Sequence, residues 1–173
     1  MRELKDFLLV GAVTCIQYKD VFPYIKTNQI KYRPQKYAVK KYENSDKKIC
    51  GTWYTTLTVP YVEPLELTKA YNEKYYHKYD NYDAINVNKT KDIPCDYYDT
   101  MGVPITFLDY YCPDQFELIG CLNHWGNSDY KNGLLCGENT EIIDKNGNVK
   151  IWSGSIVNKK ALFSRLIIKR KIN

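Results

Sequence analysis

The chain has 173 residues, of which 44% are hydrophobic and 26% are charged, and its formal net charge at pH 7 is +5. This length suits one ordinary domain, or one domain with a fragment of another, and the composition is that of a globular protein. No apolar run approaches the ~20 residues of a membrane-spanning helix, so none is predicted. The one early apolar stretch is not flanked by the residues typical of an export signal, so no such signal is predicted.

The first third of the chain reads as an α/β fragment. Phe7–Gly11 is a continuous apolar run that predicts a strand buried on both faces, as in a doubly wound parallel sheet. Asp20–Asn28 predicts a short helix with Pro23 in its first turn. Ile30–Tyr32 and Ile49–Val59 predict strands from their β-branched and aromatic residues, and the basic stretch 34–48 between them predicts a loop.

After a boundary placed near residue 62, the pattern becomes mostly β. Pro64–Tyr76 predicts one helix, because acids near its start complement the helix dipole. Glu141–Trp152 predicts a hairpin that turns at Asn146-Gly147, a dipeptide typical of a type I′ turn. The remaining predicted strands are Ala84–Val87, Ile105–Leu108, Phe116–Leu122 and Ala161–Arg170.

Charge is unevenly distributed along the chain. Residues 26–48 carry eight Lys/Arg against two acids, residues 151–173 carry six against none, and residues 63–120 carry eleven acids against five lysines. Two basic blocks around an acidic middle are typical of a protein that contacts phosphate with one face. Exposed lysine-rich strands that merely keep a protein soluble show the same pattern, and both interpretations stay open. The candidate phosphate contacts are Lys36, Lys40, Lys41, Lys159, Lys160, Lys169, Arg170 and Lys171.

Cysteines and paired acids do not predict a catalytic or metal site. The six cysteines are irregularly spaced and, without an export signal, are predicted to be free thiols in a reducing cytoplasm. Cys121 and His124 lack a second close pair of zinc ligands. The acid-rich words DNYD (Asp80–Asp83) and DYYD (Asp96–Asp99) are interpreted as solvated turns capped by their own carboxylates.

Several segments together carry a family resemblance. The words KYDNYDAINV, KDIPCDY, MGVPITFLD and PDQFELIG, within residues 75–120, resemble the C-terminal half of EcoRI-type adenine-specific DNA methyltransferases. The segments FLLVG, YKDVFPYIKTNQI, ICGTWYTTL and LFSRLIIKRK extend the similarity to nearly the whole chain. Gly102, Pro104, Phe107, Phe116, Leu118 and Ile119 in the most diagnostic words are interpreted as structural.

The resemblance implies a fold class and a division of the chain. Residues 1–62 are expected to be the C-terminal part of a Rossmann-like methyltransferase sheet, and residues 63–173 a mostly β target-recognition module. In the complete family S-adenosylmethionine is the cofactor, and an Asn-Pro-Pro-Phe-type tetrapeptide holds the flipped adenine. Neither that tetrapeptide nor a glycine-rich donor-binding turn occurs in these 173 residues. We therefore expect no catalytic residues, no cofactor and no activity in this chain alone.

The resemblance also implies a partner and a base contact. Double-stranded DNA of a restriction-modification system is the expected partner, in the cytoplasm and not at a membrane. Trp53 and Tyr54 match the position where the family is expected to offer an aromatic ring to the base, a contact that contributes about 1–3 kcal/mol. Strand alternation allows only one of the two to face a pocket. The alternative function is a non-enzymatic protein that pairs with a separate N-terminal methyltransferase half or with itself.

Overall fold

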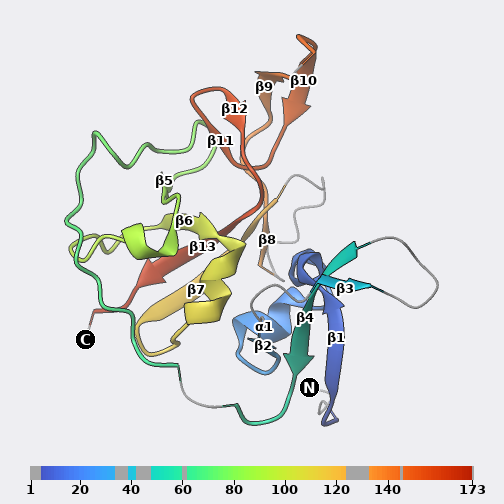
Figure 1. The fold of residues 1–173 in the computed structure, drawn as a ribbon. Coiled ribbons are helices and arrows are strands. Elements are labelled where there is room, and N and C mark those ends of the chain that lie inside the picture. The colour runs from blue at the N-terminus through green and yellow to red at the C-terminus, as the bar shows by residue number, and fades with distance from the viewer. Residues whose placement is uncertain are drawn as a thin grey trace.

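The computed structural model describes residues 5–33, 39–41, 48–59, 62–123, 133–144 and 146–172, with the backbone alone at 33, 39–41 and 48–50. The fold is a mixed α/β arrangement with mostly strands and few helices (Figure 1). Two sheets form its body, and two short hairpins extend from one end of the larger sheet.

The N-terminal sheet is antiparallel throughout. Its long strand β4 (Lys48–Thr55) lies between β1 (Leu8–Ala12) and β2 (Lys31–Arg33), and β3 (Val39–Lys41) pairs with the beginning of β4. A 3-10 helix η1 (Val13–Gln17) and the helix α1 (Phe22–Lys26) connect β1 to β2. The predicted helix around Pro23 is confirmed, since this proline occupies the first turn of α1.

The environment of the first strand differs from the prediction. A strand forms near Phe7–Gly11, but it runs antiparallel to β4 and is not buried on both faces. Leu8 is 58% exposed and Leu9 46% exposed. An apolar run specifies a strand that favours burial, but it does not specify which neighbours the chain will provide. Among the described residues, β4 is the only strand that pairs with β1.

The larger sheet has five strands in the order β5-β6-β13-β7-β8. These strands are β5 (Ile85–Asn86), β6 (Met101–Pro104), β13 (Arg165–Arg170), β7 (Phe116–Leu122) and β8 (Leu134–Leu135). The last strand in sequence, β13, occupies the centre and pairs antiparallel with both β6 and β7. The strand pairs at the two edges are parallel. The module predicted after residue 62 is therefore β-rich, as expected.

Two predicted elements of this module are wrong. Pro64–Tyr76 contains no helix; it is an extended segment whose backbone is held by distant groups. The Gln115 side chain accepts from the Leu65 N–H and donates to the Leu65 carbonyl, both at 2.7 Å. Ile105–Leu108 is not a strand but part of the 3-10 helix η3 (Ile105–Tyr110), in which consecutive residues Phe107 and Leu108 are both buried. A strand would point these neighbours to opposite faces.

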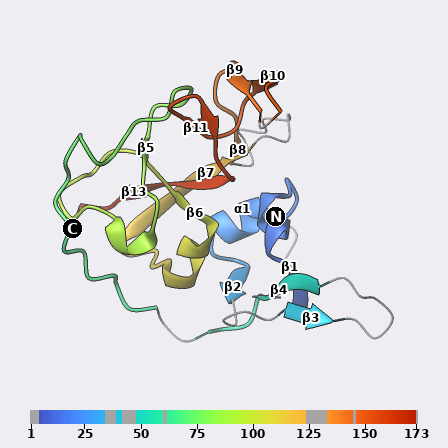
Figure 2. The same ribbon diagram turned by 45° about the horizontal axis from the view of Figure 1, so that its top comes forward.

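The larger of two hydrophobic clusters, the main core, extends across residue 62. Ile16, Phe22 and Tyr54 from the N-terminal part belong to the same buried cluster as Phe107 and Phe116 from the β-rich part. The helix α1 lies between the two sheets in the second view (Figure 2). The structural assignment of Phe107, Phe116 and Leu118 is confirmed, because all three are at most 2% exposed.

Two hairpins extend beyond the larger sheet. β9 (Thr140–Ile143) pairs with β10 (Val149–Trp152), and β11 (Ile156–Val157) pairs with β12 (Lys160–Ala161). The predicted hairpin around Asn146-Gly147 is confirmed, but its turn is not type I′, because Asn146 does not have a positive φ. The type I′ geometry occurs instead at Asn158 (φ 51°) and Lys159 (φ 60°).

No helix in the described part of the chain is long and apolar enough to cross a membrane.

Candidate nucleic-acid interface

The basic residues proposed from sequence lie in three separate places. Lys159 and Lys160 belong to the β11–β12 hairpin, and Lys169, Arg170 and Lys171 lie at the far end of β13. Lys40 and Lys41 are on β3, where the backbone alone is described, and Lys36 lies outside the described residues. The first two groups lie beyond opposite ends of the buried part of β13, Leu166–Ile168.

The β11–β12 hairpin presents its lysines on a constrained turn. The Asp80 carboxylate accepts hydrogen bonds from the backbone N–H of Asn158 at 3.0 Å and of Lys159 at 2.6 Å. The Asp80 N–H in turn donates to the Ile156 carbonyl at 2.8 Å. The side chains of Lys159 and Lys160 are exposed. The turn therefore holds two cationic side chains in solvent at a defined position.

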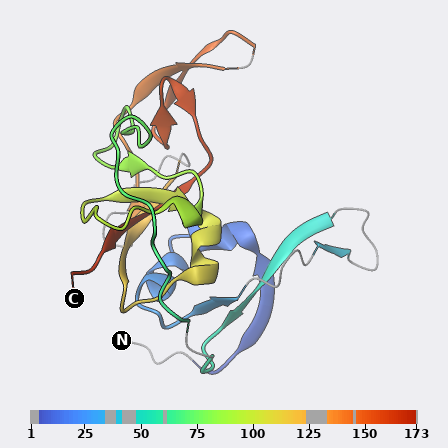
Figure 3. The same cartoon turned by 60° about the vertical axis from the view of Figure 1, so that its left-hand side comes forward.

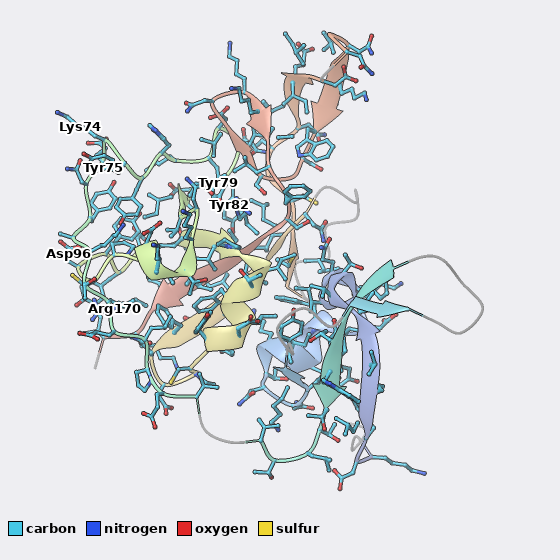
Figure 4. The ribbon with its side chains drawn as sticks, in the orientation of Figure 1. Lys74, Tyr75, Tyr79, Tyr82, Asp96 and Arg170 are labelled. Carbon is cyan, nitrogen blue, oxygen red and sulfur yellow. The ribbon has the colours of Figure 1, made fainter. Side chains whose placement is uncertain are left out.

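The second basic group closes β13 beside an aromatic ring. The Arg170 guanidinium carbon lies 4.8 Å from the centroid of the Tyr98 ring, a cation–π geometry. Its Nη1 is buried without a hydrogen-bond partner. The Lys169 ammonium is 3.8 Å from an Asp99 carboxylate oxygen, and both side chains are largely exposed, so this pair is weak. Arg170 lies at the edge of the molecule (Figure 4).

A hollow of about 240 Å³ adjoins this second basic group. Its lining includes Arg170, Lys171 and Asp114, so two cationic side chains and one carboxylate face it. The excess of positive charge suits a phosphate oxygen better than a cation.

The two adjacent aromatic residues of β4 face opposite ways. Tyr54 is 2% exposed, packs edge-on against Tyr32 at 5.8 Å, and donates its hydroxyl to the Ala12 carbonyl at 2.8 Å. Burial raises the pKa of this phenol far above its usual range. The Tyr54 ring therefore fills the core and is not accessible to a nucleobase. Trp53 is on the other face of the sheet and is half-buried, so it is the only one of the two that retains accessible surface.

Other tyrosines form a structural ladder and not an open stacking surface. Tyr71 lies between Tyr76 at 5.6 Å and Tyr97 at 4.7 Å, with interplanar angles of 24° and 33°. The Tyr76 hydroxyl donates to the Asp92 carbonyl at 2.8 Å, and burial raises its pKa. All three rings pack on the main core. Acidic residues surround them, which disfavours contact with a polyanion.

The acid-rich word DNYD is a structural anchor that sequence reasoning underestimated. Asn81 is 5% exposed, and its side-chain amide donates to the carbonyls of Glu138 at 3.1 Å and Gly154 at 2.8 Å. These carbonyls immediately flank the β9–β10 hairpin on either side. Asn81 therefore holds the base of the β9–β10 hairpin, and Asp80 holds the turn of the β11–β12 hairpin. In DYYD, Asp99 accepts from the adjacent Thr100 N–H, as a local turn cap does. Asp96 differs from the prediction, because it accepts from the backbone N–H of Tyr71, 25 positions away.

A polar hollow of about 510 Å³ lies beside the DNYD word. Its lining runs from Lys78 to Asp83 and from Cys136 to Glu138, and the labelled Tyr79 and Tyr82 lie below the hairpins (Figure 4). Tyr79 donates its hydroxyl to the Asn86 amide oxygen at 3.0 Å, and burial raises its pKa. A Cβ at Gly102 would collide with the Tyr79 ring, which explains the need for glycine in the MGVP word.

The described residues do not assemble a metal centre. No group of three or more His, Cys, Asp or Glu side chains suited to a metal occurs among them, and His124 is outside them. Cys121 is fully buried, and burial raises the pKa of its thiol to about 12. This thiol is therefore protonated and shielded at neutral pH.

The described residues also do not fit S-adenosylmethionine. A donor site on a Rossmann-like fold needs a glycine-rich turn after a parallel strand and an acid for the ribose. The cavity of about 210 Å³ between α1, β2 and η3 contains no acidic residue in its lining. The hollow beside DNYD is lined by acidic residues, but it adjoins no helix of the described chain. Gly137 is the one glycine in its lining, so a glycine-rich turn is not present there.

Comparison with known proteins assigns the amino-acid sequence of this chain to a family of methyltransferases. The family model described as adenine-specific methyltransferase EcoRI matches residues 1–171. The chain therefore belongs to the EcoRI-type adenine-specific methyltransferase family, as its sequence words indicated.

Named relatives agree with this assignment. The type II methyltransferase M.EcoRI of Escherichia coli is 43% identical over 66% of this chain and 42% of its own length. M.MgeORF184P of Mycoplasma genitalium is 36% identical over 96% of this chain and 57% of its own. M.MpnI of Mycoplasma pneumoniae is 31% identical over 98% of this chain and 58% of its own. The chain thus spans about half the length of these curated relatives. No solved structure matches it.

Proposed function

We propose that this chain is the C-terminal, target-recognition portion of an adenine-specific DNA methyltransferase of a restriction-modification system. In this role it binds duplex DNA and does not transfer a methyl group by itself. The observation that carries the proposal is the family match over residues 1–171, together with matches to three relatives that cover only 42–58% of those relatives' own lengths. A DNA substrate of this kind implies a cytoplasmic location.

The chemistry of adenine methylation supports the non-catalytic part of the proposal. The target base must be flipped out of the duplex, its amino group held by hydrogen-bond acceptors, and the methyl donor aligned within near-attack distance. The sequence contains no Asn-Pro-Pro-Phe-type tetrapeptide, and the described cavities do not suit the donor. We expect no detectable donor binding by the purified chain in isothermal titration. Micromolar affinity for S-adenosylmethionine, or methylation of a duplex without a helper protein, would contradict this part.

The charge distribution supports the DNA-binding part. The lysines of the β11–β12 turn and the group Lys169, Arg170 and Lys171 are the phosphate contacts that we propose, together with Lys36, Lys40 and Lys41. Trp53 is the aromatic residue that we propose for base stacking, in place of the buried Tyr54. Phosphate contacts position a protein on DNA without reading its sequence.

Salt dependence tests the DNA-binding proposal directly. Fluorescence anisotropy with a labelled duplex should show weak binding that falls steeply between about 50 and 200 mM salt, with a log–log slope of about −0.9 per phosphate contact. The Arg170→Gln, Lys171→Gln double variant should reduce the magnitude of this slope by about 2. The control, Lys74→Gln, removes an exposed lysine from the acidic middle and should leave the slope unchanged. Absence of binding at low salt would contradict the proposal.

The exposed first strand favours a second function, in which the chain pairs with a catalytic half or with itself. Among the described residues the outer edge of β1 is unpaired, and Leu8 and Leu9 are exposed beside it. Such an edge accepts another strand. We propose that in a complete methyltransferase the 1–62 part joins the Rossmann-like catalytic sheet. Analytical ultracentrifugation separates the possibilities: a dimer of this chain indicates self-pairing, whereas a monomer that forms a complex with a polypeptide carrying the tetrapeptide indicates a catalytic partner.

A further inference from the structure

The hairpin β9–β10 has an outward face that packs on none of the described residues. Val149 lies opposite Ile143, and Ile151 lies opposite Glu141, so these four side chains share one face of the ribbon. Ile143 is 71%, Val149 64% and Ile151 57% exposed. On the other face, Ile142 is only 6% exposed. The ribbon thus fixes itself to the molecule with one face and presents aliphatic side chains to solvent with the other.

The ribbon is held rigidly at both ends. At its base, the buried Asn81 amide donates to the Glu138 and Gly154 carbonyls, and the Glu138 N–H donates to the Asn81 carbonyl at 2.9 Å. At its tip, the Asp144 carboxylate accepts from the backbone N–H of Asn146 at 2.8 Å and of Asn148 at 3.0 Å. The Lys150 ammonium is 2.7 Å from the other Asp144 oxygen. A pre-organised element of this kind loses little conformational entropy when it binds.

The exposed groups match the chemistry of base edges. Asn146 and Asn148 project exposed amides at the tip. An asparagine amide pairs with the N6 and N7 atoms of adenine, a carboxylate such as Glu141 accepts from the amino group of cytosine, and aliphatic side chains contact the thymine methyl. A two-stranded ribbon also has the width that the major groove admits, about 12 Å. The minor groove, about 6 Å wide, does not admit it.

The surrounding charge suits the flanking phosphates. Lys159 and Lys160 are exposed on the neighbouring hairpin, whereas Lys150 on the ribbon is paired with Asp144. The nearby carboxylates of Asp144 and Asp80 are already engaged by backbone N–H groups. The third view shows the two hairpins together at the same end of the molecule, with the ribbon extending furthest from the sheets (Figure 3).

We propose that the β9–β10 ribbon enters the major groove and reads the base sequence, while the β11–β12 turn contacts the adjacent backbone. This inference rests on the DNA-binding function proposed above and assigns the reading to one element. A second protein copy is a poorer occupant of the same face. Three aliphatic side chains offer far less than the roughly 800 Å² per partner of a standard protein interface.

Selection from a randomised duplex pool with the full 173-residue chain tests the assignment. The unaltered chain should enrich a preferred sequence. Two ribbon variants, Ile143→Thr with Val149→Thr, and Asn148→Ala, should each reduce the preference for that sequence over random duplex about tenfold. Their salt slope should stay unchanged, because phosphate contacts remain. Threonine retains β-branching, and circular dichroism verifies that the fold is intact. The matched control, Leu57→Thr, alters an exposed aliphatic side chain after β4 and should preserve both affinity and preference.

Each other outcome overturns the assignment in a distinguishable way. If the unaltered chain binds no duplex at low salt, the proposed function itself fails. If it binds but enriches no sequence, or if the ribbon variants enrich the same sequence with the same preference, DNA binding stands and the ribbon is not the reader. If the ribbon variants change only the oligomeric state in ultracentrifugation, the face is a protein interface.

Discussion

The five-stranded sheet and the β9–β10 ribbon differ in what their side chains contact. In the sheet, β6 and the centre of β13 are almost wholly buried and carry or adjoin the words most diagnostic of the family. In the ribbon, most residues are exposed, and one face packs on no other residue that the structure describes. The comparison teaches that the words that identify ancestry are core words. The outer face of the ribbon, which we propose for recognition, is by contrast exposed.

The largest expected effect separates buried from exposed aromatic rings. Phe116 is fully buried and packs edge-on against Phe107 at 5.2 Å, so Phe116→Ala should lower the free energy of unfolding by about 3–5 kcal/mol. Phe163 is 90% exposed, and Phe163→Ala should change the free energy of unfolding by less than about 0.5 kcal/mol. Urea denaturation followed by tryptophan fluorescence measures both. Equal losses would show that the core does not lie where the structure places it.

The next effect concerns the link between the sheet and the ribbon. Asn81→Ala removes two hydrogen bonds from a buried amide and should cost about 1–3 kcal/mol of unfolding free energy. Amide hydrogen exchange should also accelerate in β9 and β10 more than in β7 and β13, because the ribbon loses its anchor. The exposed Asn146→Ala serves as the control, with no change in exchange at the ribbon base. Uniform acceleration across both sheets would argue against a local anchor.

A smaller effect on the free energy of unfolding, one that depends on pH, is expected from the carboxyl group of Asp109 in η3. Burial raises the pKa of Asp109 in η3 to about 6, and its Oδ1 has no hydrogen-bond partner. Because the folded carboxyl resists ionisation, unfolding free energy should fall as pH rises from about 4 to about 6 and then level off. Asp109→Asn should abolish that fall and add about 1 kcal/mol at pH 7.5, allowing for solvent screening. Parallel pH profiles of the two proteins would contradict this assignment.

The smallest effect on stability is expected at the ribbon tip. Hydrogen bonding to Lys150, then to the N–H groups of Asn148 and Asn146, holds the pKa of Asp144 far below its usual range. A depressed pKa stabilises the tip at all pH values above the ordinary carboxyl range, and the contribution disappears only as pH falls through the lowered value. Asp144→Ala should leave the unfolding midpoint nearly unchanged but accelerate amide exchange at Asn146 and Asn148. Unaltered exchange would show that the carboxylate does not order the tip.

Sequence patterns located elements that have a strong local signal. The strand Phe116–Leu122 was predicted with its observed bounds, because a short, mostly apolar run follows the turn residues Pro113 and Asp114. The hairpin near Asn146-Gly147 and the helix at Pro23 were also predicted. Much of the first basic block lies outside the described residues, but within it the strand β3 (Val39–Lys41) forms where a loop was predicted. The second block proved to be divided between the two ends of β13.

Sequence patterns failed where distant groups replaced local hydrogen bonds. The segment Pro64–Tyr76 has helix-compatible residues, yet Gln115 holds the Leu65 backbone across 50 positions of sequence. Ile105–Leu108 has strand-like residues, yet two consecutive side chains are required in the core. For Trp53 and Tyr54, alternation predicted that one would face inward, and cross-strand packing on Tyr32 selected Tyr54. Local propensity is a weak prior that tertiary contacts override.

The amino-acid sequence by itself determined the family, the β-rich character after residue 62 and the core role of Phe107, Phe116 and Leu118. These properties follow from short segments that resemble the family's sequences and from hydrophobic periodicity, and both are local features of the sequence. Only the tertiary structure decided that β1 is exposed, that Asn81 anchors a hairpin 57 positions away, and that the ribbon projects from the sheets. Burial and anchoring depend on which distant segments meet, and no local pattern encodes that meeting.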